Sequence, residues 1–235
     1  MFKQKHIAVI IPAAGVGQRM KFASEGKSKQ FLTLQDRPLI YYTLKKFEDS
    51  DYVDDIIIVC EEKWIPFVAT DVVDAYEFTK VRKIVTGGTQ RQDSVFNGLK
   101  AIERADIVLV HDAVRPFIST KKINELIEEC LTHEAVILAV QPKDTIKSQD
   151  RHQFVDKTLD RTELWNVQTP QAFQYDLLMD AFTEAHRKNF YGTDESTLVE
   201  ALGVKVKLLE GEYQNIKITT PEDLVIAEAI LRKLE

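Results

Sequence analysis

Three cationic side chains, Arg19, Lys29 and Lys217, stand beside glycine-containing or apolar segments in distant parts of the sequence. Arg19 follows residues 12–18 (PAAGVGQ), where glycines and small side chains let backbone N–H groups approach an anion. Lys29 lies ten residues beyond Arg19. Backbone donors beside fixed positive charges predict a binding site for phosphate groups. The alternative is a tight turn whose cations are merely solvated.

Two common phosphate-binding motifs do not fit this first loop. The dinucleotide-binding fingerprint requires glycine at position 20, which holds Met20, and an acidic residue roughly 20 residues later, which is missing. Residues 26–28 (GKS) resemble the end of a Walker A loop, but its first glycine would fall on Lys21 and no strand directly precedes it. These mismatches argue against an NAD-dependent oxidoreductase and against a Walker A phosphate site.

A second glycine-containing loop covers residues 86–95 (TGGTQRQDSV). Its adjacent glycines, Gly87 and Gly88, let the backbone come close to a flat ligand. Ser94 stands where a helical pattern opens. We expect backbone N–H and C=O groups of this loop to hold a nucleobase with help from Ser94. An ordinary loop with a helix N-cap is the alternative.

A third group of polar residues, at positions 111–116 (HDAVRP), follows an apolar run at 107–110. A strand that ends in His, Asp and Arg brings both signs of charge to its carboxyl end, where open α/β sheets bind ligands. Asp112 could orient a hydroxyl or a metal–phosphate assembly, and Arg115 could hold a phosphate through two hydrogen bonds. An internal ion pair between Asp112 and Arg115 is the alternative.

Short β-branched runs alternate with helical patterns, which predicts an α/β fold with right-handed crossovers and a mostly parallel sheet. Lys217 would lie in the last strand, where a lysine is natural at an anion site, although protection of an edge strand also explains it. Ser119 or Thr120 is expected to cap the third helix, and Thr220 the last one. The expected strands are 7–11, 56–60, 83–85, 107–110, 135–140, 206–209 and 216–218, and the expected helices are 38–47, 91–102, 121–131 and 221–234.

The chain has 235 residues, of which 44% are hydrophobic and 29% charged, and this balance fits one globular domain over residues 1–235. Residues 141–160 are polar and lack a clean helical period, so they form either a loose loop or a protruding arm. A net charge of −6 argues against a general nucleic-acid binder. No apolar run approaches the roughly 20 residues of a membrane span, and we expect a cytoplasmic protein.

Metal and redox motifs are missing from the sequence. Cys60 and Cys130 are too few and too far apart for a disulfide framework or a zinc site, so we expect buried free thiols. The five histidines show no metal-ligand spacing such as HExxH. A structural metal is therefore not expected.

Taken in order, the motifs resemble those of the 2-C-methyl-D-erythritol 4-phosphate cytidylyltransferase family, within the larger group of sugar nucleotidyltransferases. The resemblance extends over nearly the whole chain. The matching segments are Pro12-Ala13-Ala14-Gly15-x-Gly17-x-Arg19-Met20, Lys29-Gln30, Arg91-x-x-Ser94-Val95, His111-Asp112-Ala113-x-Arg115-Pro116, Lys143-Asp144-Thr145-Ile146-Lys147, Arg161-x-x-Leu164-Trp165, Gln168-Thr169-Pro170-Gln171, Thr193-Asp194-Glu195 and Asn215-Ile216-Lys217-Ile218-Thr219.

This resemblance implies a Rossmann-like three-layer sandwich and transfer of CMP from CTP to methylerythritol 4-phosphate, with release of pyrophosphate. It implies Mg²⁺ held mainly by the triphosphate and a homodimer in which residues 141–160 are a dimerisation arm. By resemblance, Arg19, Lys29 and Lys217 are catalytic; Ala13, Ala14, Gly15, Gly17, Gly88, Thr89, Ser94, Asp112 and Ala113 bind CTP; and Arg115, Thr145, Arg161, Thr169 and Thr193 bind the acceptor, with Thr145 and Arg161 reaching across the dimer.

Such a reaction needs charge compensation more than a base. A phosphate monoester has a second pKa near 6, so the attacking group is already mostly dianionic at pH 7. Arg19, Lys29, Lys217 and Mg²⁺ would stabilise the charge on the reacting phosphates. Ribitol 5-phosphate cytidylyltransferases share the CTP-binding motifs and are the nearest alternative. A nucleotide-binding regulator without activity would keep the loops but has no need of the cations.

Overall fold

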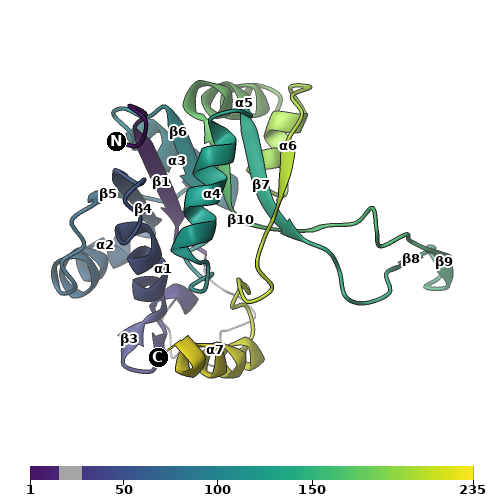
Figure 1. The fold of residues 1–235 in the computed structure, drawn as a ribbon, viewed down its shortest axis with the longest axis horizontal. Helices are drawn as coiled ribbons and strands as arrows, with labels where there is room; N and C mark the ends of the chain where they lie inside the picture. Colours follow the sequence, from purple (N-terminus) through teal and green to yellow (C-terminus); the bar gives the residue numbers. More distant parts are fainter. Residues whose placement is uncertain (16–27, 235) are drawn as a thin grey trace.

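The computed structural model describes residues 1–15 and 28–234. Figure 1 shows a central sheet with helices on both of its faces and a long hairpin that extends away from it. Two residues of the first predicted phosphate loop, Gly17 and Arg19, lie outside the described residues. Their predicted roles therefore stay predictions.

Seven strands form the central sheet, in the order β11-β7-β10-β6-β1-β4-β5. All neighbouring strands pair in parallel except β10, which runs antiparallel to both β6 and β7. The predicted α/β fold with a mostly parallel sheet is thus confirmed. The strands are β1 Ile7–Pro12, β4 Asp55–Cys60, β5 Val81–Thr86, β6 Ile107–Val110, β7 Ala135–Val140, β10 Asn166–Gln174 and β11 Lys207–Glu210.

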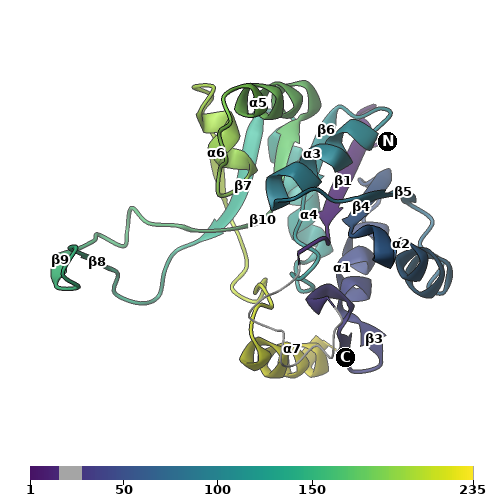
Figure 2. The ribbon, with the colours of Figure 1, turned by 180° about the vertical axis from the view of Figure 1, so that it is seen from behind.

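Both faces of the sheet are covered by helices, because its central strands are apolar on both sides. On one face Val9 and Ile11 of β1 share an apolar cluster with residues of α1 and α4. On the other face Ala8 and Ile10 pack with residues of α3, α5 and α6. The molecule is therefore a three-layer sandwich, as Figures 1 and 2 show. The helices are α1 Leu39–Glu48, α2 Ile65–Phe67, α3 Arg91–Ala101, α4 Thr120–Cys130, α5 Tyr175–Arg187, α6 Glu195–Glu200 and α7 Pro221–Leu234.

Side-chain caps start two of the predicted helices. The hydroxyl of Ser119 accepts a hydrogen bond from the Lys122 N–H at 3.1 Å, so Ser119 rather than Thr120 caps α4. At α7 the Asp223 carboxylate accepts the Thr220 N–H at 2.9 Å, and the Thr220 hydroxyl accepts the Asp223 N–H at 3.4 Å. The sequence signals for these two helix starts are confirmed.

Two expectations about strands were wrong. The segment 216–218 is not a strand: Ile218 is buried and its N–H donates to the Val114 carbonyl at 2.9 Å, so a local contact replaces sheet pairing. Strand β10 was not expected, because its many polar residues obscure the alternation of apolar and polar positions that marks a strand. The last parallel strand lies one residue beyond its expected position, at β11 rather than 206–209.

Shorter elements surround this core. A two-stranded sheet, β2 with β3, packs near α7, and an apolar cluster that includes Leu34, Val114, Ile218 and Leu231 joins them. A 3₁₀ turn, η2, precedes β2, and η3 and a π-helical stretch, η4, flank α2. Their bounds are η2 Lys29–Phe31, β2 Thr33–Leu34, β3 Arg37–Pro38, η3 Glu62–Trp64 and η4 Val68–Asp74.

The hairpin that extends from the sandwich is the predicted arm. Its strands, β8 (Lys147–Gln149) and β9 (Val155–Thr158), pair only with each other, and every residue of β9 is exposed. Figure 1 shows both legs of the arm leaving the sheet between β7 and β10. The returning leg runs on to β10 at Asn166, so the protruding segment is slightly longer than residues 141–160.

Candidate active site

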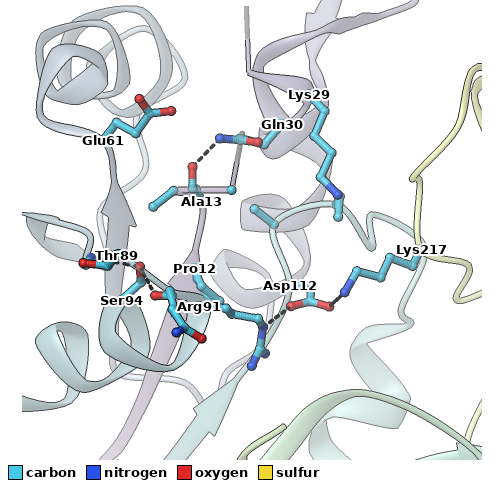
Figure 3. A pocket seen from close by; sticks show the side chains of 16 residues that line it. Pro12, Ala13, Lys29, Gln30, Glu61, Thr89, Arg91, Ser94, Asp112 and Lys217 are labelled. Atoms are coloured by element: carbon cyan, nitrogen blue, oxygen red, sulfur yellow. Dashed lines mark hydrogen bonds and ion pairs between the residues drawn. The ribbon is translucent and has the colours of Figure 1, made fainter. Parts of the chain in front are cut away.

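A cavity of about 380 Å³ opens at the carboxyl ends of β1, β5 and β6. This is the edge at which an α/β sheet binds its ligands. We call it the first cavity, and Figure 3 shows most of its wall. Its wall includes ten residues predicted from the sequence: Ala13, Ala14, Gly15, Lys29, Gly88, Thr89, Ser94, Asp112, Ala113 and Lys217.

Close packing of two loops shapes one side of the first cavity. A Cβ atom added at Gly87 would lie 2.5 Å from the Ala14 Cβ, so the loop after β5 approaches the loop after β1 too closely for any larger residue. The Gln30 amide donates to the Ala13 carbonyl and ties η2 to the same loop. The two glycine-containing segments therefore form one continuous wall.

Ser94 holds the second loop in shape. Its hydroxyl accepts the Gly88 N–H at 3.0 Å and donates to the Gln90 carbonyl at 3.0 Å. Gln90 is the N-cap of α3, and its N–H donates to the Asp93 carboxylate at 3.0 Å. Ser94 therefore orders the backbone groups that we expect to face a nucleobase, which is a more indirect contribution than its predicted contact with the ligand.

Asp112 is the centre of an ion cluster at the floor of the first cavity. Its Oδ2 lies 2.7 Å from the Lys217 Nζ, and its Oδ1 lies 3.1 Å from the Arg91 Nε. The Arg115 Nε is 3.9 Å from Oδ2. Burial alone would raise the pKa of Asp112, but Arg91, Lys217 and Arg115 together hold it well below its usual range. The carboxylate is thus ionised at neutral pH.

The position of Lys217 follows from its apolar neighbours. Ile218 is fully buried in the cluster that joins α7 to β2 and β3, and its backbone bonds to Val114. Lys217 therefore extends back over the loop after β6 toward Asp112, as Figure 3 shows. The sequence predicted the cavity position of this lysine correctly and its strand wrongly.

A second cavity of about 290 Å³ lies beside the first. Arg91, Asp112 and Lys217 line both cavities, so two ligands bound in them would meet at these side chains. The second cavity also contains the predicted acceptor-binding residues Arg115, Thr169 and Thr193. The Thr169 hydroxyl accepts the Asp112 N–H at 3.0 Å, which joins β10 to the end of β6.

Arg115 is more enclosed than a phosphate ligand usually is. Its Nη1 donates to the Asn215 carbonyl at 2.7 Å, and only 12% of its side chain is exposed. Burial lowers the pKa of Arg115, although Asp112 opposes this effect. The ion pair between Asp112 and Arg115, the alternative expected from the sequence, is present, and its 3.9 Å is the longest distance of the cluster.

His111 is fully buried behind the cluster and neutral. Its Nε2 lies 2.9 Å from the Arg115 carbonyl, which can only accept, so Nε2 carries the proton. The Nδ1 atom then accepts from the Thr169 hydroxyl at 3.2 Å. Burial lowers the pKa of His111 to about 4. The imidazole therefore supports the loop after β6 from below and faces neither cavity.

Two predicted acceptor-binding residues lie elsewhere in a single copy of the chain. Thr145 and Arg161 belong to the arm, and neither is among the described residues that line the first or second cavity. Arg161 donates to the Lys143 carbonyl at 3.0 Å and lines a hollow at the base of the arm with Tyr213. Within one copy, the chain does not bring these two residues to the ion cluster.

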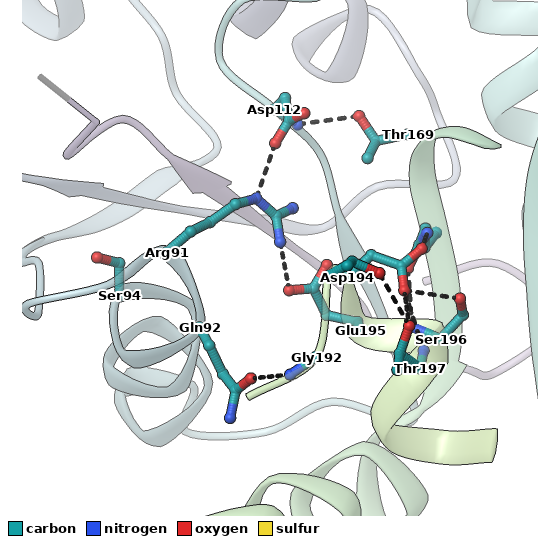
Figure 4. Close-up of polar contacts among 12 residues, drawn as sticks. Arg91, Gln92, Ser94, Asp112, Thr169, Gly192, Asp194, Glu195, Ser196 and Thr197 are labelled. Carbon is teal, nitrogen blue, oxygen red and sulfur yellow. Dashed lines mark hydrogen bonds and ion pairs between the residues drawn. The ribbon is translucent and has the colours of Figure 1, made fainter. Parts of the chain in front are cut away.

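Among the charged residues near the cavities that were not predicted as site residues are Arg91 and Glu195. Arg91 bridges Asp112 to Glu195, with 2.7 Å between its Nη1 and the Glu195 Oε1 (Figure 4). Both residues stand in the motifs quoted above, Arg91 three positions before Ser94 and Glu195 directly after Asp194. An arginine at the first position of a helix, beside a ligand loop, is the signal that could have identified Arg91.

The donor atoms of the first cavity fit a magnesium ion that enters bound to a polyphosphate. Mg²⁺ prefers oxygen ligands and usually binds one or two carboxylates together with substrate phosphates. Two acidic residues, Asp112 and Glu61, line this cavity. Across residues 1–15 and 28–234, no cluster of three or more acidic, histidine or cysteine side chains could hold a metal ion on its own. Phosphate oxygens would have to supply most of the ligands.

Comparison with known proteins identifies the family. A family model for 2-C-methyl-D-erythritol 4-phosphate cytidylyltransferase matches residues 7–233. The chain belongs to this family. A cytidylyltransferase of this name from Clostridium acetobutylicum is 46% identical over 224 residues, covering 95% of this chain and 96% of that protein. Another, from Halalkalibacterium halodurans, is 43% identical over 228 residues, covering 97% of this chain and 98% of that protein.

Solved structures of the same cytidylyltransferase family share the fold. The 4-diphosphocytidyl-2C-methyl-D-erythritol synthase from Anaerococcus prevotii superposes with a TM-score of 0.85 at 36% identity, over 97% of this chain and 96% of that one. The Thermus thermophilus enzyme gives 0.80 at 32% identity, over 97% and 99% of the two chains. The resemblance seen in the motifs is confirmed.

Of the helices within residues 1–15 and 28–234, none combines the length and the apolar character that a membrane span requires.

The two cysteines, Cys60 and Cys130, are free and buried, as expected. Burial raises the pKa of the Cys60 thiol to about 11 and that of Cys130 to about 12. Neither thiol is therefore a nucleophile at neutral pH.

Proposed function

We propose that this chain transfers CMP from CTP to 2-C-methyl-D-erythritol 4-phosphate, forming 4-diphosphocytidyl-2-C-methyl-D-erythritol and pyrophosphate. The family membership supports the reaction. The observation that carries the assignment to this site is the pair of adjoining cavities that share Arg91, Asp112 and Lys217. The first cavity takes the nucleotide and the second takes the acceptor.

The reaction is an in-line displacement at the α-phosphorus of CTP. An oxygen of the acceptor phosphate forms the new P–O bond while the bond to the bridging oxygen of the β-phosphate breaks. The electron pair of the broken bond stays on pyrophosphate. Because the acceptor phosphate is mostly dianionic at pH 7, no side chain has to remove a proton.

Lys29 and Lys217 compensate the negative charge that accumulates when two phosphates meet. They come from η2 and from the segment before α7, and both line the first cavity. Cations held in this way lower the activation barrier, because they orient the reacting phosphates and stabilise the negative charge of the transition state. Arg19 is given the same role because it follows the first glycine-containing loop in the sequence. Mg²⁺ bound with CTP would supply further charge neutralisation, and Asp112 and Glu61 are the acidic residues that line this cavity.

The proposal includes a homodimer. The hairpin β8–β9 has no core of its own within the chain, and Phe154 and Val155 at its tip are 72% and 65% exposed. A two-stranded hairpin is marginally stable in water, so its apolar tip is better explained by a second copy. In such a dimer Thr145 and Arg161 would reach the acceptor cavity of the other copy.

We also propose a cytoplasmic location, because free thiols at Cys60 and Cys130 suit the reducing conditions of the cytoplasm.

The decisive experiment is pyrophosphate release from CTP with each purified acceptor. We expect turnover with methylerythritol 4-phosphate and at most weak turnover with ribitol 5-phosphate. A strong preference for ribitol 5-phosphate would overturn the choice of acceptor and keep the cytidylyl transfer. CTP binding without turnover on either acceptor would instead favour a nucleotide-binding regulator.

A further inference from the structure

Glu195 is a buried carboxylate at the edge of the site. The residue is 1% exposed, its Oε1 lies 2.7 Å from the Arg91 Nη1, and its Oε2 has no hydrogen-bond partner among the described residues. Burying an ionised carboxylate is unfavourable unless a partner compensates its charge. Arg91 is the partner that does so. The ion pair with Arg91 therefore explains how the Glu195 carboxylate can be buried.

Arg91 also contacts Asp112, which in turn contacts Lys217 at the wall of the first cavity. Its Nε lies 3.1 Å from the Asp112 Oδ1, while the Asp112 Oδ2 lies 2.7 Å from the Lys217 Nζ. Glu195, Arg91, Asp112 and Lys217 thus form a chain of alternating charges across α6, α3, the end of β6 and the segment before α7. A lysine at position 91 could not replace the arginine, because only a guanidinium presents Nε and Nη donors in two fixed directions.

The start of α6 is held independently of Arg91. The Asp194 carboxylate caps the helix by accepting the Thr197 N–H at 3.0 Å, and it also accepts from the Ser196 hydroxyl at 2.9 Å. Gln171 of β10 donates to Asp194 at 2.8 Å and accepts the Ser196 N–H at 3.1 Å. These bonds fix the backbone at Glu195 without using its carboxylate, which leaves that carboxylate free to hold Arg91.

We propose that Glu195 and Arg91 are a positioning pair: they fix the Asp112 carboxylate, and through it the Lys217 amine, in the geometry that receives the acceptor phosphate. This inference rests on the proposed function. It assigns Glu195, which lines neither cavity, a role through Arg91, Asp112 and Lys217 and no contact with the reacting atoms.

The test is steady-state kinetics of Glu195→Gln, which keeps the side-chain shape and removes the charge. We expect kcat to fall by about 10- to 100-fold, because small displacements of a reacting group have effects of this size. The KM for CTP should change by less than about twofold, since Glu195 itself does not line the first cavity. A role limited to folding would instead lower the active fraction of the enzyme, and kcat per active site would then equal that of the wild type.

A double-mutant cycle separates positioning from general damage. In an Arg91→Gln background, and equally in a Lys217→Ala background, Glu195→Gln should cost less than about a further twofold, because its route to the phosphate is already broken. The Arg91→Gln/Glu195→Gln protein also avoids an unpaired buried charge. Independent, additive losses in these backgrounds would overturn the proposal.

Ser196→Ala is the matched control. It removes the 2.9 Å hydrogen bond to Asp194 at the same helix start and leaves Arg91 untouched. We expect its kcat to stay within about twofold of wild type. If Ser196→Ala loses as much activity as Glu195→Gln, the effect belongs to the helix and the proposal fails.

A readout without turnover keeps this inference separate from the proposed function. Hydrogen exchange at the Arg91 Nε, followed by NMR, should be slow in wild type and about tenfold faster or more in Glu195→Gln. Equal exchange in the two proteins would contradict the positioning pair. Wild-type enzyme that is inactive with every acceptor would refute the proposed function and leave the exchange measurement to decide on the pair.

Discussion

At the scale of residues, the site depends on cations that several elements bring together around Asp112. Lys217 contacts this carboxylate at 2.7 Å, and Lys29 lines the same cavity from η2. The composition of the whole chain, with its net charge of −6, does not reveal such a local arrangement. The motifs predicted that both lysines belong to one site, and the structure brings both to the wall of the first cavity.

Replacing either lysine tests this electrostatic role. We expect Lys29→Ala and Lys217→Ala each to lower kcat by at least about 10²-fold, the size of effect seen when one charge-stabilising contact is lost. The measurement is pyrophosphate release at saturating CTP. Lys121→Ala, which changes an exposed cation on α4, is the control and should retain wild-type turnover. Near wild-type activity in either lysine variant would remove it from the mechanism.

His111 leads to a prediction about stability and pH. Its pKa is about 4 in the folded protein, against about 6.5 in an unfolded chain, so the unfolded state takes up the proton first as the pH falls. The contribution is fully present above pH 6.5 and is lost between pH 6.5 and 4. It amounts to about 3 kcal/mol, because the shift is a little over two pKa units.

Urea unfolding at a series of pH values checks this expectation. The free energy of unfolding of the wild type should fall more steeply between pH 6.5 and 4 than that of a His111→Gln variant. Asp112 and Arg115 act on the imidazole with opposite signs, so the burial of the ring is the main cause. Parallel curves for the two proteins would show that His111 does not carry this dependence.

At the scale of elements, the position of α3 on the sheet depends on Gly98. A Cβ atom added there would lie 2.7 Å from the Ile10 Cγ2 and 2.8 Å from the Val59 Cγ2, so the helix rests directly on β1 and β4. The same helix carries Arg91 and Ser94 at its start. Close packing at its middle therefore helps to set the geometry of the site at its N-terminal end.

Gly98→Ala should destabilise the protein, although alanine is the better helix former. Higher helix propensity would add about 1 kcal/mol of stability, while overpacking typically costs about 1–3 kcal/mol, and here two methyl groups are in the way. We expect a net loss in the free energy of urea unfolding. Val59→Ala in the same protein removes one of those methyl groups, so the double variant should lose less than the two separate effects combined. A stabilised Gly98→Ala protein would show that α3 can move.

Strand β10 shows why some elements could not be predicted. Its sequence, NVQTPQAFQ, contains mostly polar residues, yet Gln171 is fully buried and bonded to Asp194 and Ser196. Buried polar side chains carry no apolar period, because their burial depends on partners that lie far away in the sequence. The opposite error occurred at 216–218. The two isoleucines there predicted a strand, but their side chains pack in an apolar cluster and hold a loop in place.

At the scale of the whole molecule, the arm lies apart from both cavities within one copy, as far as the described residues show. We expect Phe154→Ser/Val155→Ser to shift the protein from dimer to monomer in analytical ultracentrifugation, since it removes the apolar surface at the tip of the hairpin. The KM for the acceptor should rise in the monomer, because Thr145 and Arg161 would no longer reach a second site. Lys157→Ser, an exposed change on the same hairpin, is the control. A wild-type protein that is monomeric at micromolar concentration would contradict the dimer.

The sequence alone predicted the features that depend on residues close together along the chain. Apolar runs and helix caps identify most parallel strands and several helices, and glycines and cations mark the loops that bind ligands, because these signals arise between residues close together in sequence. The partnership of Arg91 with Glu195, the buried polar strand β10 and the path of Lys217 were not readable. Arg91 lies about 100 residues from Glu195, as Asp112 does from Lys217, while β10 depends on pairing with β6 and β7 and on bonds to residues after α5. Such contacts exist once packing has folded these segments together.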